Sequence, residues 1–176
     1  MNPIKLRDIR TAVEDYLNSS VPVTVTTVRP SDPGGTMNPN EHGTFDVLVL
    51  NTGEPDGVAL TNVRLHLTFK KDSAGNDIGA KFLAPATAVA IAREGTSDSS
   101  ALLKPGDPFT EMVLFPPDNT LDVPGLIEVQ NLVVVAPGHA GPEVTIQCHP
   151  HAETDQNFLF PAGERGKNGT TSFTVT

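Results

Sequence analysis

The residues with the clearest chemical potential are two histidines that flank a proline, His149 and His151. Cys148 comes immediately before them, and His139 lies a short distance upstream. Residues two apart on a β-strand point to the same face, so both imidazoles would lie side by side. Neutral imidazoles and a thiolate are good ligands of Zn²⁺. The pattern therefore predicts a candidate zinc site made of Cys148, His149 and His151.

A structural interpretation competes with that zinc site, and we favour it. The sequence contains no C-x-x-C pair, and Pro150 interrupts strand pairing in the middle of the motif. Cys148 is then a small core residue at a strand end. A nucleophilic role is weaker still, because His149 would point to the opposite face of the strand and a base would have to come from elsewhere.

Pairs of acidic residues in predicted loops form a second candidate site. Ca²⁺ takes six to eight oxygen ligands, and carboxylates supply them. None of the acidic runs matches the twelve-residue calcium loop with its closing glutamate. We therefore interpret them first as solvated turns and only second as calcium ligands. The pairs are Glu54 with Asp56, Asp72 with Asp77, and Asp118 with Asp122.

Motifs of the common catalytic classes are missing from the sequence. It contains no nucleophile elbow, HExxH, phosphate loop or dinucleotide fingerprint. It has no Trp and one Tyr, so a flat aromatic platform for sugars is hard to assemble. We expect a protein that is not an enzyme and has no cofactor beyond a candidate Ca or Zn ion.

Length and composition indicate one globular domain. The chain has 176 residues, of which 38% are hydrophobic and 19% charged. Its net charge of −9 disfavours binding to nucleic acid and to anionic membrane surfaces. No apolar run is long enough to span a membrane. The opening MNPIKLRDIR has no apolar core of a secretory signal, so we expect a cytoplasmic protein or one exported without a signal, and the compartment stays open.

The stretch from His42 to Phe69 organises the rest of the chain as two strands joined by the turn NTGEPDG. Phe45, Val47 and Val49 alternate with other residues, which is the period of a strand with one buried face. After the turn the alternation resumes at Val63, and the phase change just before it predicts a β-bulge.

Further short strands with turn signals between them favour an all-β, Ig-like antiparallel β-sandwich of about eight strands. One of these strands is expected to break near Asn131. The predicted strands lie at 21–28, 81–94, 109–115, 126–136, 144–149, 158–160 and 172–175.

One amphipathic helix is predicted at the N-terminus, over residues 3–17. Asn2 can cap it, and Pro3 sits where a missing N–H costs least. The domain organisation is thus an N-terminal helix over 1–19 and a sandwich over 20–176. The helix either covers an edge of the sheet or docks on a neighbouring subunit.

The central stretch resembles the Ig-like modules of bacterial surface and adhesion proteins, including CARDB-like domains and related conserved-repeat domains. The resemblance consists of FDVLVLNTG followed by GVALTNVRLHL, with Asn51, Thr52 and Gly53 at the strand end and an Ala/Leu-x-Asn-Val step over 59–63. It implies an Ig-like fold and a non-enzymatic structural, adhesion or protein-binding role. It transfers no catalytic or binding residue.

These observations leave three functional hypotheses. The first is a structural or protein-binding Ig-like module with a protein partner or with self-association. The second is a subunit of a phage-like or contractile tail assembly that docks through the N-terminal helix. The third is a metal-binding module that uses the Cys148–His151 segment or the acidic loops.

Overall fold

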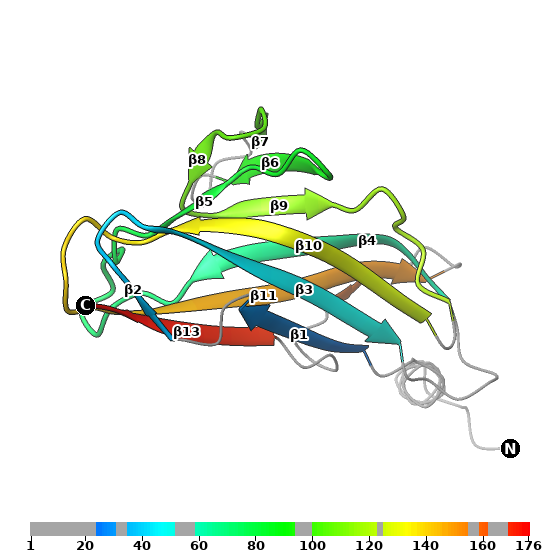
Figure 1. Ribbon diagram of the computed structural model, residues 1–176. Coiled ribbons are helices and arrows are strands. Elements are labelled where there is room, and N and C mark those ends of the chain that lie inside the picture. Colours follow the sequence, from blue (N-terminus) through cyan, green and yellow to red (C-terminus); the bar gives the residue numbers. More distant parts are fainter. Residues whose placement is uncertain are drawn as a thin grey trace, which may run out of the picture.

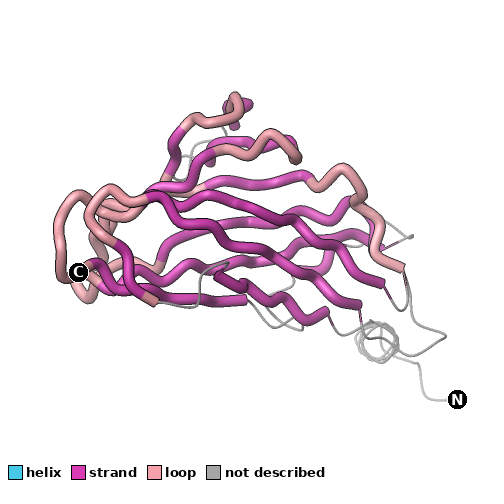
Figure 2. The backbone as a smooth tube through the Cα atoms, viewed as in Figure 1, coloured by secondary structure: helices cyan, strands magenta, loops and turns pink. Residues whose placement is uncertain are grey.

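The regular elements that the structure describes are all strands. The computed structural model describes residues 24–30, 35–51, 59–93, 100–122, 125–154, 159–161 and 169–176. For residues 24–30, 93, 100–101, 153–154 and 159–161 it describes the backbone alone. Strands make up most of that part of the chain, as the tube in Figure 2 shows. The all-β prediction is therefore confirmed. The predicted helix at 3–17 and the boundary between 1–19 and 20–176 lie outside the described residues.

The strands form two sheets that lie against each other (Figure 1). The first, sheet A, has the order β1-β3-β10-β5-β8 and is antiparallel throughout. Its strands are β1 Thr24–Pro30, β3 His42–Asn51, β10 Gly125–Val135, β5 Lys81–Leu83 and β8 Pro108–Phe109.

The second sheet, sheet B, has the order β2-β13-β11-β4-β9-β6-β7, and β12 also pairs with β11. Its pairs are antiparallel except for β2, which runs parallel to β13. Its strands are β2 Thr36–Met37, β13 Gly169–Val175, β11 Glu143–Thr154, β4 Leu60–Phe69, β9 Met112–Phe115, β6 Val89–Arg93, β7 Ser100–Leu102 and β12 Leu159–Pro161.

The strand order identifies an Ig-like sandwich. β1-β3-β10-β5 occupy the positions of strands A-B-E-D, and β13-β11-β4-β9 those of strands G-F-C-C′. One departure is that β5, in the D position, precedes β9 along the chain. The long central strands β3, β10, β4 and β11 carry most of the pairing in both sheets.

The structure has thirteen described strands instead of about eight, and the excess lies mainly between residues 81 and 115. The predicted strand at 81–94 is two strands, β5 in sheet A and β6 in sheet B. The predicted strand at 109–115 is likewise divided into β8 in sheet A and β9 in sheet B. The chain crosses between the sheets within each of these runs, so no single strand can continue through either.

The core lies between the sheets and is built by the predicted alternation. On β3, Phe45, Val47 and Val49 are buried while the residues between them are partly exposed. On β11, every second residue from Val144 to Ala152 is buried. Each of these strands therefore hides one face against the other sheet.

Two β-bulges preserve that alternation in the long strands. The sequence predicted a bulge before Val63, whereas the break that it predicted near Asn131 is a bulge in the continuous strand β10. On β10 the register shifts between Val129 and Leu132, so two residues lie opposite Asp46 of β3. Asn131 adopts a left-handed conformation with φ of 57°, and its N–H donates to Asp46 Oδ1 at 2.8 Å. On β4, Asn62 has φ of 51° beside a second register shift. Asparagine tolerates this conformation better than most residues.

The left-handed conformation at Asn131 can be tested by substitution. We expect Asn131→Val to lower the free energy of unfolding by about 1–3 kcal/mol, because a β-branched residue is strained there. Asn131→Gly should be close to neutral, since glycine adopts this conformation without strain. Gln130→Val, at the neighbouring exposed position, is the control. Urea denaturation measures all three, and equal losses for the valine variants would contradict the role of the backbone conformation.

Candidate functional site: the outer face of sheet B

The predicted zinc ligands lie on β11, and the strand places them on two different faces. Cys148 points into the core and is fully buried. Desolvation raises the pKa of its thiol, which disfavours the thiolate that binds metals or attacks substrates. His149 and His151 are half-buried on the outer face of sheet B. The structure thus brings the two histidines together and separates both from Cys148.

A third histidine joins them from β4. His66 lies directly opposite His149 in the strand register, and its ring centroid is 6.0 Å from that of His149 and 6.2 Å from that of His151. Glu111 closes the group, with its Oε1 2.5 Å from His66 Nε2. Sequence analysis missed His66 and Glu111 because only the pairing of β4 with β11 and β9 makes them neighbours.

The register also joins this histidine group to an apolar surface at the edge of the sheet. His149 pairs with His66, and His66 with Val113 of β9. Val113 pairs with Ile91 of β6, and Ile91 with Leu102 of β7. Side chains directly opposite each other in neighbouring strands share a face. One transverse row therefore crosses five strands of sheet B, with histidine at one end and leucine at the other.

We call the apolar part of this surface the edge patch. Val89 is paired with Phe115 and lies two residues from Ile91, so the pair forms a second row beside the first. The side chain of Leu102 is 72% exposed and that of Val89 is 55% exposed. The edge patch consists of Val89, Ile91, Leu102, Val113 and Phe115.

No three His, Cys, Asp or Glu side chains of the described residues are arranged to hold a metal ion. Of the acidic pairs, Glu54 and Asp56 lie outside the described residues. Asp118 Oδ1 accepts the N–H of Thr120 at 3.3 Å, which is the contact of a polar turn.

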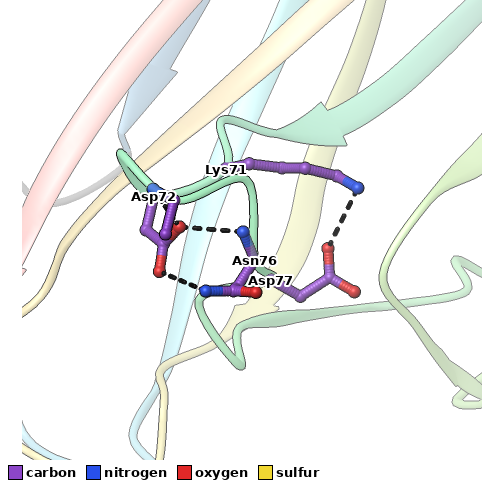
Figure 3. Close-up of polar contacts among 5 residues, drawn as sticks. Lys71, Asp72, Asn76 and Asp77 are labelled. Carbon is purple, nitrogen blue, oxygen red and sulfur yellow. Dashed lines mark hydrogen bonds and ion pairs between the residues drawn. The ribbon is translucent and has the colours of Figure 1, made fainter.

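The loop after β4 shows the same structural use of a carboxylate (Figure 3). Asp72 Oδ1 accepts the N–H groups of Ala74 and Asn76, both at 2.8 Å, and Oδ2 accepts the Asn76 side-chain amide at 3.2 Å. Asp77 does not share this role, and its Oδ1 lies 3.9 Å from Lys71 Nζ. The bonds from Asn76, first that of its backbone and then that of its side chain, lower the pKa of Asp72. The carboxylate thus fixes a turn.

Asn51, at the strand end within the resemblance to surface modules, also has a structural role. It is the buried polar residue of the described core, and its Nδ2 donates to the Leu121 carbonyl at 3.4 Å. That bond ties the end of β3 to the segment that precedes β10. Thr52 and Gly53 lie outside the described residues.

Among the described residues there is no helix long and apolar enough to cross a membrane. The sequence matches no family model and no curated protein. Solved structures align with most of the chain at low sequence identity.

Three of these structures illustrate the range of proteins that are similar to this chain. AvmM, which catalyses macrocyclization in alchivemycin A biosynthesis, is 15% identical, with 86% of this chain and 88% of that chain covered and a TM-score of 0.47. A cohesin module from a Clostridium perfringens family 33 glycoside hydrolase is 11% identical, with coverage of 89% and 98% and a TM-score of 0.47. The CARDB domain of PF1109 from Pyrococcus furiosus, in complex with di-metal ions, is 11% identical, with coverage of 89% and 90% and a TM-score of 0.40.

A CARDB domain is thus among the similar structures, as the sequence resemblance predicted. At these identities the likeness concerns the fold alone, and the Ig-like topology rests on the strand order of this chain. A fold of this kind serves enzymes and binding modules alike, so function must be argued from the surface.

The role of Asp72 predicts how the turn responds to acid. Its carboxyl should titrate below the ordinary value of 3.8, which carbon-13 NMR of the side chain measures directly. A lowered folded-state pKa stabilises the fold above pH 3.8, and this contribution is lost as the pH falls through the folded-state value. Asp72→Asn should therefore be less stable than the wild type at pH 7 and equal to it in strong acid. A midpoint at or above 3.8 would contradict the turn assignment.

Proposed function

We propose that this protein is a non-enzymatic protein-binding module that presents the edge patch to a partner protein. The observation that carries the proposal is the exposure of Leu102 and Val89 at the end of a continuous row of apolar side chains on sheet B. Burying an apolar surface contributes roughly 25 cal/mol per Å², so a partner that covers this patch gains affinity from it.

The position of the patch at a sheet edge supports a protein partner in particular. β7 is the last strand of sheet B, and among the described strands it pairs only with β6. The other edge of such a strand offers backbone N–H and C=O groups to an added strand. An extended segment of a partner, or β7 of a second copy, would combine those hydrogen bonds with contacts to Leu102. This arrangement suits the structural and adhesion roles expected from the sequence.

The tail-assembly hypothesis remains a separate proposal. It depends on docking through the predicted helix at 1–19, which the structure does not describe. It differs from the edge-patch proposal in the surface that it uses.

Site-specific crosslinking tests the edge patch even while the partner protein is unidentified. A photoreactive phenylalanine analogue at Leu102 should give a specific adduct with a partner protein, or with a second copy, in cells that naturally produce the chain. The matched control is the same analogue at Leu126, which is 54% exposed on the outer side of sheet A. Leu102→Asp should abolish binding of the captured partner and leave the fold intact. Adducts at Leu126 and none at Leu102 would assign the interface to sheet A instead.

Metal binding by the 148–151 segment stays a second proposal, and one observation favours it. His66 adds a third imidazole to His149 and His151 on the outer face, with ring centroids 6.0 and 6.2 Å away, whereas Cys148 lies on the other side of the strand. Because the described side chains are not arranged to hold a metal ion, zinc would have to draw these imidazoles together on binding. Imidazoles are good ligands for Zn²⁺, which takes four ligands. The site would need water or Glu111 to complete that number.

A zinc titration followed by histidine side-chain NMR resolves this second proposal. If the outer face binds zinc, His149→Ala with His151→Ala should abolish the shifts, while Cys148→Ala should leave them unchanged because that thiol is buried. His139→Ala is the control, since His139 is an exposed residue of the turn between β10 and β11. Absence of saturable shifts at His66, His149 and His151 would end the metal proposal.

A further inference from the structure

A hollow of about 530 Å³ opens where two strands of sheet B separate. β4 and β9 pair last at Leu67 and Met112. Beyond that point β4 continues to Phe69. The segment that precedes β9 turns away from β4, and Phe109 of β8 pairs with Phe82 in sheet A. The walls of the hollow therefore come from both sheets, and it is distinct from the edge patch.

The floor of the hollow is apolar and is anchored in the core. Phe69, Ile78 and Phe109 line it. The ring of Phe69 stacks on buried Phe82 with centroids 4.0 Å apart and an interplanar angle of 10°. Phe82 in turn contacts Phe45 of β3, with centroids 5.9 Å apart. This chain of aromatic rings holds the floor in place.

The rim of the hollow gathers positive charge on an acidic protein. Three of the five lysine and arginine side chains that the structure describes line it, and the whole chain has a net charge of −9. Lys71 forms an exposed pair with Asp77 at 3.9 Å, and Glu111 is held by His66. Lys70 and Lys81 have no ion pair among the described residues. The five are Arg64, Lys70, Lys71, Lys81 and Lys104.

We propose that this hollow binds a short acidic peptide segment that carries an apolar side chain. The exposed ammonium groups of Lys70 and Lys81 attract carboxylates, and the floor between them accepts an aromatic or aliphatic group. A long polyanion is disfavoured because the rest of the chain is acidic, whereas a short segment meets only the local cations. β8 is the last strand of sheet A and lines the hollow, so an extended peptide also finds a strand edge there.

The test is an NMR titration of the nitrogen-15-labelled full chain with the capped peptide Ac-DFELD-NH2. We expect saturable shifts in residues 68–71, 78–81 and 108–111. The uncharged analogue Ac-NFQLN-NH2 should bind much more weakly, and added salt should weaken the acidic peptide, because exposed charges are screened. Phenylpropionate tests the alternative of a small aromatic acid, and binding as tight as that of the peptide would overturn the peptide assignment.

Single charge removals identify the cations. Lys70→Gln and Lys81→Gln should each weaken the acidic peptide about two- to fivefold, the range expected for one exposed ion pair. Lys104→Gln removes the same charge from an exposed turn outside the hollow and should change affinity less than about twofold. All three side chains are exposed, so the variants should keep the wild-type spectrum elsewhere. Equal effects at Lys104, equal binding of the uncharged peptide, or shifts confined to the edge patch would overturn the proposal.

Discussion

One core serves both sheets because two asparagines, Asn62 near the start of β4 and Asn131 within β10, take a left-handed backbone conformation. A strand alternates strictly, so a register shift of one residue exchanges its buried and exposed faces. On β10 the buried residues are Ile127 and Val129 before the bulge but Leu132 and Val134 after it. Only the extra residue at Asn131 keeps both pairs inside. Asparagine adopts the left-handed conformation more readily than most residues, and burial of each large aliphatic side chain contributes about 1.5–3 kcal/mol, so the bulge is favourable overall.

The corresponding bulge on β4 decides which residues the outer face of sheet B presents. Leu60 is buried before Asn62, whereas Val63, Leu65 and Leu67 are buried after it. Because of that shift, His66 points outward beside His149 and Val113. Without the bulge, His66 would face the core and Leu67 would face solvent. The row that links the histidines to the edge patch is thus a consequence of one backbone conformation.

Local periodicity was sufficient to predict the long strands and the bulge before Val63, and it indicated an irregularity near Asn131 that is a bulge rather than a strand break. His42–Asn51 and the run from Val144 to Cys148 alternate clearly, and asparagine stands at both bulges. The region from 81 to 115 was not predictable in the same way, because its short strands alternate between the sheets. β5 and β8 join sheet A, whereas β6, β7 and β9 join sheet B. His66 and Glu111 were missed for a related reason. Strand register is a property of the pairing, and no residue of β4 by itself indicates that β11 and β9 lie on its two sides.

The region from 81 to 115, which the sequence did not predict correctly, contributes to both proposed binding surfaces. The chain passes from β4 in sheet B to β5 in sheet A, returns to sheet B for β6 and β7, and crosses once more between β8 and β9. These crossings extend sheet B, and the hollow lies beside them. The edge patch lies on the outer face of sheet B and is apolar, whereas the hollow lies at the separation of β4 from β9 and is rimmed by Lys70 and Lys81. The edge patch favours apolar side chains of a partner, whereas the hollow favours acidic ones. A single extended partner segment can therefore engage one surface without the other, and substitutions at Leu102 and Lys81 act independently as long as the sandwich between them stays rigid.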